Sequence, residues 1–102
     1  MATYLTVRRA RGPAWNAALP LRGQAQWAEP AAFMNALTAE GFIVLGGPLG
    51  SGELRAGEEV LLVVNSTSED AVRARFALDP WTTSGLLTIT HVEPWTVLLR
   101  GT

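Results

Sequence analysis

The run Glu58-Glu59-Val60-Leu61-Leu62-Val63-Val64-Asn65 decides the fold, because five apolar residues in a row fill both faces of one strand. The run Phe42 to Gly46 is also apolar on both faces, and it ends at Gly46-Gly47-Pro48. A glycine-rich connection over residues 50–57 joins the two runs. They therefore predict a hairpin whose sheet is apolar on both sides.

One helix is predicted on each side of this hairpin in the sequence. Residues 27–40 carry apolar side chains at helical spacing, and Gly41 follows as a stop signal. Because proline fits only the first turn of a helix, we expect regular helix to begin near Pro30. After the hairpin, Ser66-Thr67-Ser68-Glu69 has the form of a capping box and predicts a helix over residues 68–78, ended by Asp79-Pro80.

The two ends of the chain predict further strands. Residues 3–9 alternate with a period of two, and residues 86–92 form an apolar run that Glu93-Pro94 interrupts before residues 95–99 resume it. Residues 10–26 contain glycine and proline without periodicity and predict a long loop.

The order strand, helix, strand, strand, helix, strand predicts an α+β, ferredoxin-like βαββαβ fold with a four-stranded antiparallel sheet. A length of 102 residues predicts one domain, 1–102. Two helices cover only one face of such a sheet, and a bare apolar face is unusual for a monomer. We therefore expect a homodimer formed through the second face of the sheet.

Composition excludes several classes of function. Eight basic and nine acidic residues give a net charge of -1, so we expect no nucleic-acid partner. The chain has no cysteine and one histidine, so we expect no metal site and no cofactor. The N-terminal residues do not form a signal peptide, and the longest apolar run, Val60–Val64, is far too short to cross a membrane. The expected location is the cytoplasm, without membrane association.

Asp79, in Leu78-Asp79-Pro80-Trp81, is the foremost candidate for chemistry. An aspartate before proline commonly orders a turn through its own side chain, which is the structural interpretation. The alternative is catalytic. The C-terminal end of a helix is its negative pole, and burial beside Trp81 also disfavours the charged form. Both effects would raise the pKa of Asp79 and let it act as a general acid or base near neutral pH.

Other residues carry weaker signals. His91 lies in the last predicted strand, either as a hydrogen-bonded sheet residue or as a lone acid or base. Arg9 and Arg11 lead into Trp15 and offer guanidinium groups and an aromatic plane to an anionic ligand, or else they form a solvated strand end. Trp15 and Trp81 lie in predicted connections, where they either anchor the core or line a pocket.

Four stretches together resemble the YCII-related family and span nearly the whole chain: Arg11-Gly12-Pro13-Ala14-Trp15, Trp27-Ala28-Glu29-Pro30-Ala31-Ala32-Phe33-Met34, Glu40-Gly41-Phe42-Ile43-Val44-Leu45-Gly46-Gly47-Pro48-Leu49 and Asp79-Pro80-Trp81. This resemblance implies a dimeric alpha/beta barrel built from ferredoxin-like subunits. The family includes a dehydrochlorinase that acts on a chlorinated muconolactone, and its proposed active pair is a histidine on the first helix and an aspartate before proline.

The resemblance places the family aspartate at Asp79 and the family histidine at Pro30, which has no proton to transfer. Asp79 then acts alone or with an arginine, or the pocket binds without turnover, or only the fold persists. Two hypotheses follow. The first is a small-molecule-binding dimer with a degenerate active site, in which Arg9, Arg11, Trp15, Pro30 and Trp81 contact the ligand. The alternative is a lyase or isomerase acting on a small polar or lactone-like substrate with Asp79, and less directly His91, as catalytic residues.

Overall fold

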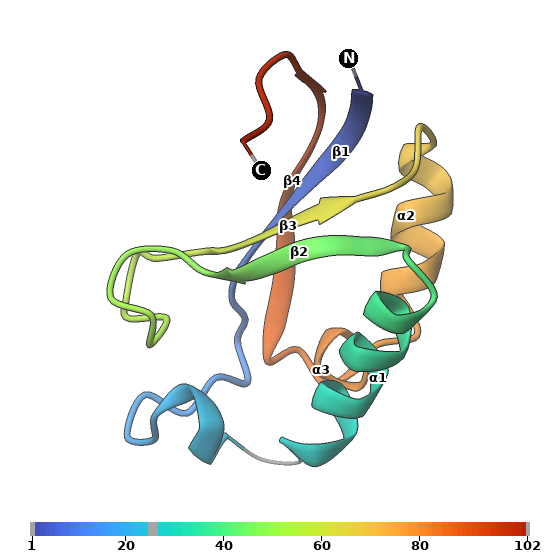
Figure 1. Cartoon of the computed structure of the whole chain (residues 1–102). Coiled ribbons are helices and arrows are strands. Elements are labelled where there is room, and N and C mark those ends of the chain that lie inside the picture. The colour runs from blue at the N-terminus through green and yellow to red at the C-terminus, as the bar shows by residue number, and fades with distance from the viewer. Residues whose placement is uncertain (1, 25–26, 102) are drawn as a thin grey trace.

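The computed structural model describes residues 2–24 and 27–101. Within these ranges the chain forms a four-stranded antiparallel sheet, three α-helices and one 3-10 turn (Figure 1). The strands are β1 (Ala2–Arg11), β2 (Ile43–Pro48), β3 (Val60–Val64) and β4 (Leu87–Val97). The helical segments are η1 (Leu21–Gly23), α1 (Ala28–Ala39), α2 (Glu69–Phe76) and α3 (Pro80–Thr83). The strand order β2-β3-β1-β4 is compatible with the predicted ferredoxin-like fold.

Helices α1 and α2 cover one face of the sheet (Figure 1). Leu37 of α1 and Val72 and Phe76 of α2 share a buried core with alternate residues of the strands, such as Val7. Strand pairing explains which strand residues enter this core, because Val7 lies opposite Leu62 in β3 and opposite Val92 in β4. The core therefore follows the period of two that residues 3–9 predict.

The ends of both long helices follow from local chemistry. Ser68 is the N-cap of α2, where its hydroxyl accepts a hydrogen bond from Ala71 N at 3.1 Å, so a serine caps this helix but the Ser66–Glu69 capping box does not form its start. After α1, Gly41 has a φ of +83°, which glycine adopts without strain, and its N–H donates to Thr38 O. Regular helix in α1 begins at Ala28 rather than near Pro30, so Pro30 lies inside the first turn.

The second face of the sheet is apolar over β2 and β3 and mixed over β1 and β4, where polar side chains lie on the same face as Tyr4 and the 47% exposed Trp95. Leu45 is 61% exposed there, opposite Val63. Arg8 lies opposite His91, and Glu59 accepts a hydrogen bond from the Thr90 hydroxyl and lies 3.8 Å from Arg8. The expectation of an apolar second face is therefore confirmed for the β2–β3 hairpin, which lies on one side of the sheet, and only in part for β1 and β4.

Two sequence predictions differ from the structure near the C-terminal half. The second long helix, α2, ends at Phe76, before the predicted residue 78, and Asp79-Pro80 begins α3, a four-residue helix too short to show periodicity. Strand β4 runs through Pro94 without interruption, and this strand lies at the edge of the sheet, where a proline is tolerated. The pairing register of β4 with β1 shifts between Arg8 and Arg9, which marks a bulge or similar irregularity in this pair of strands.

A second apolar cluster lies beside the main core. It contains Leu54, Trp81, Leu86 and Leu87, and Val60 packs against both clusters. Leu54 is fully buried although it belongs to the connection between β2 and β3, and it thereby ties that connection to α3. Among the described residues, no helix is long and apolar enough to cross a membrane.

Candidate functional site

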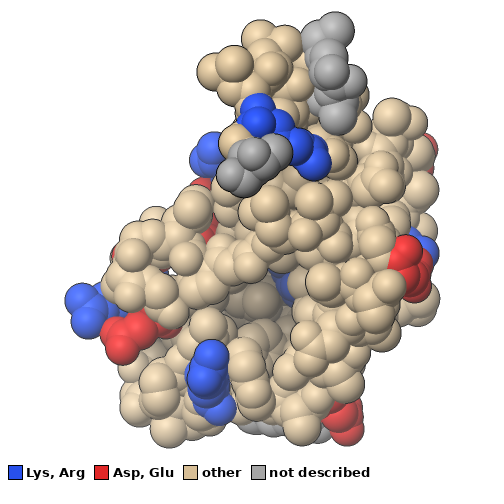
Figure 2. Space-filling view, viewed as in Figure 1, with Lys and Arg blue, Asp and Glu red and all other residues tan. Residues whose placement is uncertain are grey.

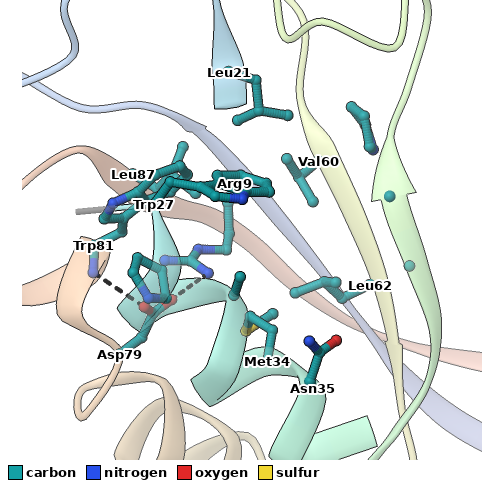
Figure 3. Close-up of a pocket in the computed structure, with 15 residues that line it drawn as sticks. Arg9, Leu21, Trp27, Met34, Asn35, Val60, Leu62, Asp79, Trp81 and Leu87 are labelled. Carbon is teal, nitrogen blue, oxygen red and sulfur yellow. Dashed lines mark hydrogen bonds and ion pairs between the residues drawn. The ribbon is translucent and has the colours of Figure 1, made fainter. Parts of the chain in front are cut away.

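A cavity of approximately 470 Å³ lies between α1 and the helix-covered face of the sheet. Figure 2 shows the hollow on this face, and Figure 3 shows the residues around it. We call it the α1 cavity. Its size falls in the range typical of sites for small organic ligands. The described residues that line it are Arg9, Leu21, Trp27, Pro30, Ala31, Met34, Asn35, Gly46, Gly47, Pro48, Val60, Leu62, Asp79, Trp81 and Leu87.

A buried ion pair forms one wall of the α1 cavity (Figure 3). Arg9 Nη1 lies 2.7 Å from Asp79 Oδ2, and the two side chains are 2% and 1% exposed. Arg9 Nη2 donates to the Thr82 hydroxyl at 2.9 Å. Burial lowers the pKa of Arg9, whereas the charge and the hydrogen bond of Asp79 act in the opposite direction. The structure thus brings together two of the predicted site residues as partners of each other.

Asp79 occupies a different electrostatic position from the one the sequence predicts. It is the N-cap of α3, and its Oδ1 accepts a hydrogen bond from Trp81 N at 3.0 Å (Figure 3). The sequence predicts that the C-terminal end of a helix repels the Asp79 carboxylate. In the structure the start of α3 governs its surroundings instead, because it supplies an N–H donor to the carboxylate. Both oxygens of Asp79 are engaged within the protein, one by Trp81 N and one by Arg9.

Pro30 and Trp81 also line the cavity, as predicted for ligand contacts. Pro30 is buried in the first turn of α1, and its ring offers only apolar surface. Trp81 is 3% exposed, and its ring centroid lies 5.4 Å from that of Trp27, with the planes tilted by 56°. The lining beside the ion pair is therefore aromatic and apolar.

Arg11 and Trp15 do not line the α1 cavity, although they lie close to one another. The Arg11 guanidinium carbon lies 5.0 Å from the centroid of the Trp15 ring, and Arg11 Nε donates to Leu54 O at 2.7 Å. Trp15 packs against the second apolar cluster. These contacts hold the β2–β3 connection against the end of β1 and the loop that follows it.

His91 is also outside the α1 cavity. Its register partner in β1 is Arg8, whose side chain alternates with that of Arg9 and so points to the second face. Its Nδ1 lies 3.0 Å from the Thr90 hydroxyl and 3.8 Å from Glu59 Oε2, and its side chain is 52% exposed. The structure therefore does not bring His91 and Asp79 together at one site.

Several cavity residues were not predicted from the sequence. Trp27, Met34 and Asn35 come from α1, with Trp27 at its N-cap, and Leu62 comes from the floor of the sheet (Figure 3). Thr82 is a further missed partner of the ion pair. The inward orientation of Arg9, which was among the predicted ligand contacts, could be read from the sequence, because Arg9 shares the alternation of Leu5 and Val7 and so points into the helix-covered face. No comparable pattern indicated which face of α1 would line a cavity instead of closing on the sheet.

Comparison with known proteins adds no assignment to this geometry. No protein-family model matches the chain, and searches of curated proteins and of solved structures returned no match. What the fold and the site define is an α+β protein with a four-stranded antiparallel sheet and a predominantly apolar cavity that opens at the surface (Figure 2).

Proposed function

We propose that this chain is a small-molecule-binding protein whose ligand occupies the α1 cavity and whose active site is degenerate. The single observation that carries this proposal is the state of Asp79. Its two oxygens are held by Arg9 Nη1 and Trp81 N, so the carboxylate is committed to contacts within the protein that any ligand would have to share or displace. General acid–base catalysis needs a group within hydrogen-bond reach of the reacting atom and in the right protonation state.

Pro30 supports the same proposal. If the chain is a member of the YCII-related family, Pro30 occupies the position of the family histidine, and it lines the same cavity as Asp79. A proline there supplies shape and apolar contact but no proton. The retained cavity together with the missing acid or base is what we expect of a protein that binds without turnover.

A ligand screen by thermal denaturation tests the binding proposal. A ligand at a hundred times its Kd stabilises the folded protein by about 2.7 kcal/mol, which raises the Tm of a domain of this size by roughly 10–20 °C. The control is Ala31→Trp, because Ala31 lines the cavity and a large side chain there fills it. Ligands that stabilise the wild type should not stabilise this variant. Stabilisation that is equal in both proteins contradicts the proposal.

A second candidate function is a lyase or isomerase step with Asp79 as general acid or base. The observation in its favour is that Asp79 lines a cavity whose other walls are largely apolar. Under this alternative, Arg9 releases Asp79 when a polar or lactone-like substrate enters. Turnover of an identified substrate that is lost in Asp79→Asn and increased in Pro30→His would establish the enzyme and refute the binding proposal.

We also propose that the protein is a homodimer of the dimeric alpha/beta barrel type, which packs the second faces of two sheets together. The support is the strand order and the exposed Leu45 on that face. Arg8, Glu59 and His91 would then lie within or at the rim of the interface, where ion pairs contribute more to specificity than to affinity. We keep the cytoplasm as the proposed location.

A further inference from the structure

We propose that the α1 cavity selects uncharged, predominantly apolar ligands and excludes anions. This inference rests on the proposed binding function and names the class of ligand. It runs against the simplest interpretation of an arginine in a cavity wall, which is a receptor for a carboxylate or phosphate. Arg9 is already matched by Asp79, and the geometry of this pair decides what else the cavity accepts.

The charges of the cavity cancel within the protein. Of the described residues that line it, only Arg9 and Asp79 carry a charge, and their 2.7 Å contact is almost completely buried. An incoming anion would meet a cation whose charge is neutralised and a carboxylate that repels it. To bind Arg9 it would have to displace Asp79, which would leave that carboxylate buried without its partner.

The hydrogen bonds of Arg9 are directed to the protein as well. Nη1 contacts Asp79, Nη2 donates to Thr82, and Nε is buried from solvent without a hydrogen-bond partner. Because Nε is closed off within the wall, it is not presented to a molecule in the cavity. The guanidinium therefore acts as part of the wall and not as a binding fork.

The remaining surface favours apolar and aromatic groups. Trp27 and Trp81 contribute ring surface, Met34 contributes a polarisable thioether, and Leu62 closes the floor. Among the uncharged side chains of the described lining residues, Asn35 alone offers both a hydrogen-bond donor and a strong acceptor, which favours a ligand with few polar groups. A charged ligand would lose its hydration in such a site without a compensating partner.

A matched pair of fluorescent probes tests the charge selection. N-phenyl-1-naphthylamine and 1-anilinonaphthalene-8-sulfonate share one aromatic skeleton and differ by the sulfonate. We expect the neutral probe to bind the wild type at least about tenfold more tightly than the anionic probe, a difference of about 1.4 kcal/mol. Binding of the neutral probe should be lost in Ala31→Trp.

Two variants convert the site into an anion receptor. Asp79→Asn leaves the Arg9 charge unmatched, so the affinity for the sulfonate should rise at least about tenfold relative to the neutral probe. Because that variant can unfold, Met34→Lys provides an independent route by adding an unmatched cation beside an intact ion pair. Its matched control, Met34→Leu, should keep the wild-type preference. Near-ultraviolet circular dichroism verifies the fold of each variant, since partly unfolded proteins bind the anionic probe non-specifically.

The outcomes separate this inference from the proposed function. If the anionic probe binds the wild type as tightly as the neutral one and both are lost in Ala31→Trp, the binding function holds and the charge selection is wrong. If neither probe binds in a manner that Ala31→Trp abolishes, both are wrong. An unchanged probe preference in a folded Met34→Lys variant also overturns the charge selection.

Discussion

At the scale of single residues, Asp79 is the centre of a buried polar network. Its carboxylate joins the start of α3 to β1 through Trp81 N and Arg9, and Arg9 continues the network to Thr82. A buried ion pair is weak evidence of net stabilisation, but removing one partner leaves an uncompensated buried charge. The pair therefore fixes the position of α3 against the sheet, whatever its net contribution to stability.

The substitution Asp79→Asn should lower the free energy of unfolding by about 3–5 kcal/mol. Urea denaturation followed by circular dichroism measures this change. The matched control is Asp70→Asn on the exposed surface of α2, for which we expect about 0.5 kcal/mol or less. The double substitution Arg9→Met with Asp79→Leu removes both charges together and should lose much less than Asp79→Asn alone. Equal effects of Asp79→Asn and Asp70→Asn would contradict the role of the pair.

The sequence could indicate the two members of this pair but not their contact. Strand alternation places Arg9 on the face of Leu5 and Val7, and the Asp-Pro sequence singles out Asp79. The two residues are 70 positions apart in the sequence, and their meeting depends on α3, which a four-residue pattern cannot predict. The sequence placed Asp79 only at the C-terminal end of a helix for the same reason, because the short α3 that Asp79 caps could not be predicted.

At the scale of elements, the connection between β2 and β3 is ordered by one carboxylate. Glu58 accepts hydrogen bonds from the Ser51 hydroxyl, from Ser51 N and from Arg55 N. These bonds, with the Ser51 hydroxyl first, lower the pKa of Glu58. Together with the buried Leu54, these hydrogen bonds give the connection between β2 and β3 a defined structure.

The order of this connection should depend on pH. A carboxyl group whose pKa is lower in the folded state contributes stability that is complete above its unfolded pKa and is lost as the pH falls through its folded pKa. The amide resonances of Ser51 and Arg55 should therefore stay constant from neutral pH down to the ordinary range of glutamate and shift only below it. Glu58→Gln should abolish this transition. A midpoint at or above the ordinary glutamate value would contradict the assignment.

The segment after β1 depends on close backbone contact with the segment before β4. Gly12 N donates to Leu86 O at 2.8 Å, and a Cβ on Gly12 would lie 2.0 Å from Gly85 O. Gly12→Ala must therefore move the backbone, and we expect a loss of about 1–3 kcal/mol in the free energy of unfolding. Gly47→Ala is the control, since a Cβ there meets nothing within 4 Å. Urea denaturation in which both variants equal the wild type would refute this contact.

The helices and strands could be predicted largely from periodicity and capping signals. The stop at Gly41 and a serine cap within residues 66–69 are confirmed, because each acts through its own local chemistry. The end of β1 was less predictable. Its continuation through Ala10 and Arg11 depends on pairing with Leu87 and Thr88 of β4, which are distant in the sequence.

At the scale of the whole molecule, the second face of the sheet is the surface on which a dimer depends. Its apolar part over β2 and β3 follows from the continuous apolar run of residues 60–64, whereas the polar cluster on β1 and β4 depends on the strand order, which places Arg8 beside His91. A dimer that uses this face buries Leu45 and encloses a polar cluster. Such an interface is more specific but less strongly driven than a wholly apolar one.

Sedimentation velocity at micromolar concentration should give the mass of a dimer. Leu45→Glu places a charge on the exposed apolar part of the second face and should shift the protein to monomer. Leu78→Glu is the matched control, because Leu78 is 70% exposed after α2, away from the sheet. A wild type that sediments as a monomer, or a Leu45→Glu variant that remains a dimer, would overturn the dimer proposal.

The neighbouring indoles of Trp27 and Trp81 have a spectroscopic consequence. Their ring centroids are 5.4 Å apart and their planes are tilted by 56°, so their excited states couple and the tilt makes the coupled transitions chiral. The pair should therefore give an exciton couplet in the far-ultraviolet circular dichroism, distinct from the signal of the helices and strands. Because both rings line the α1 cavity, the couplet changes whenever a molecule enters and alters the tilt, which makes occupancy of the cavity visible without a label.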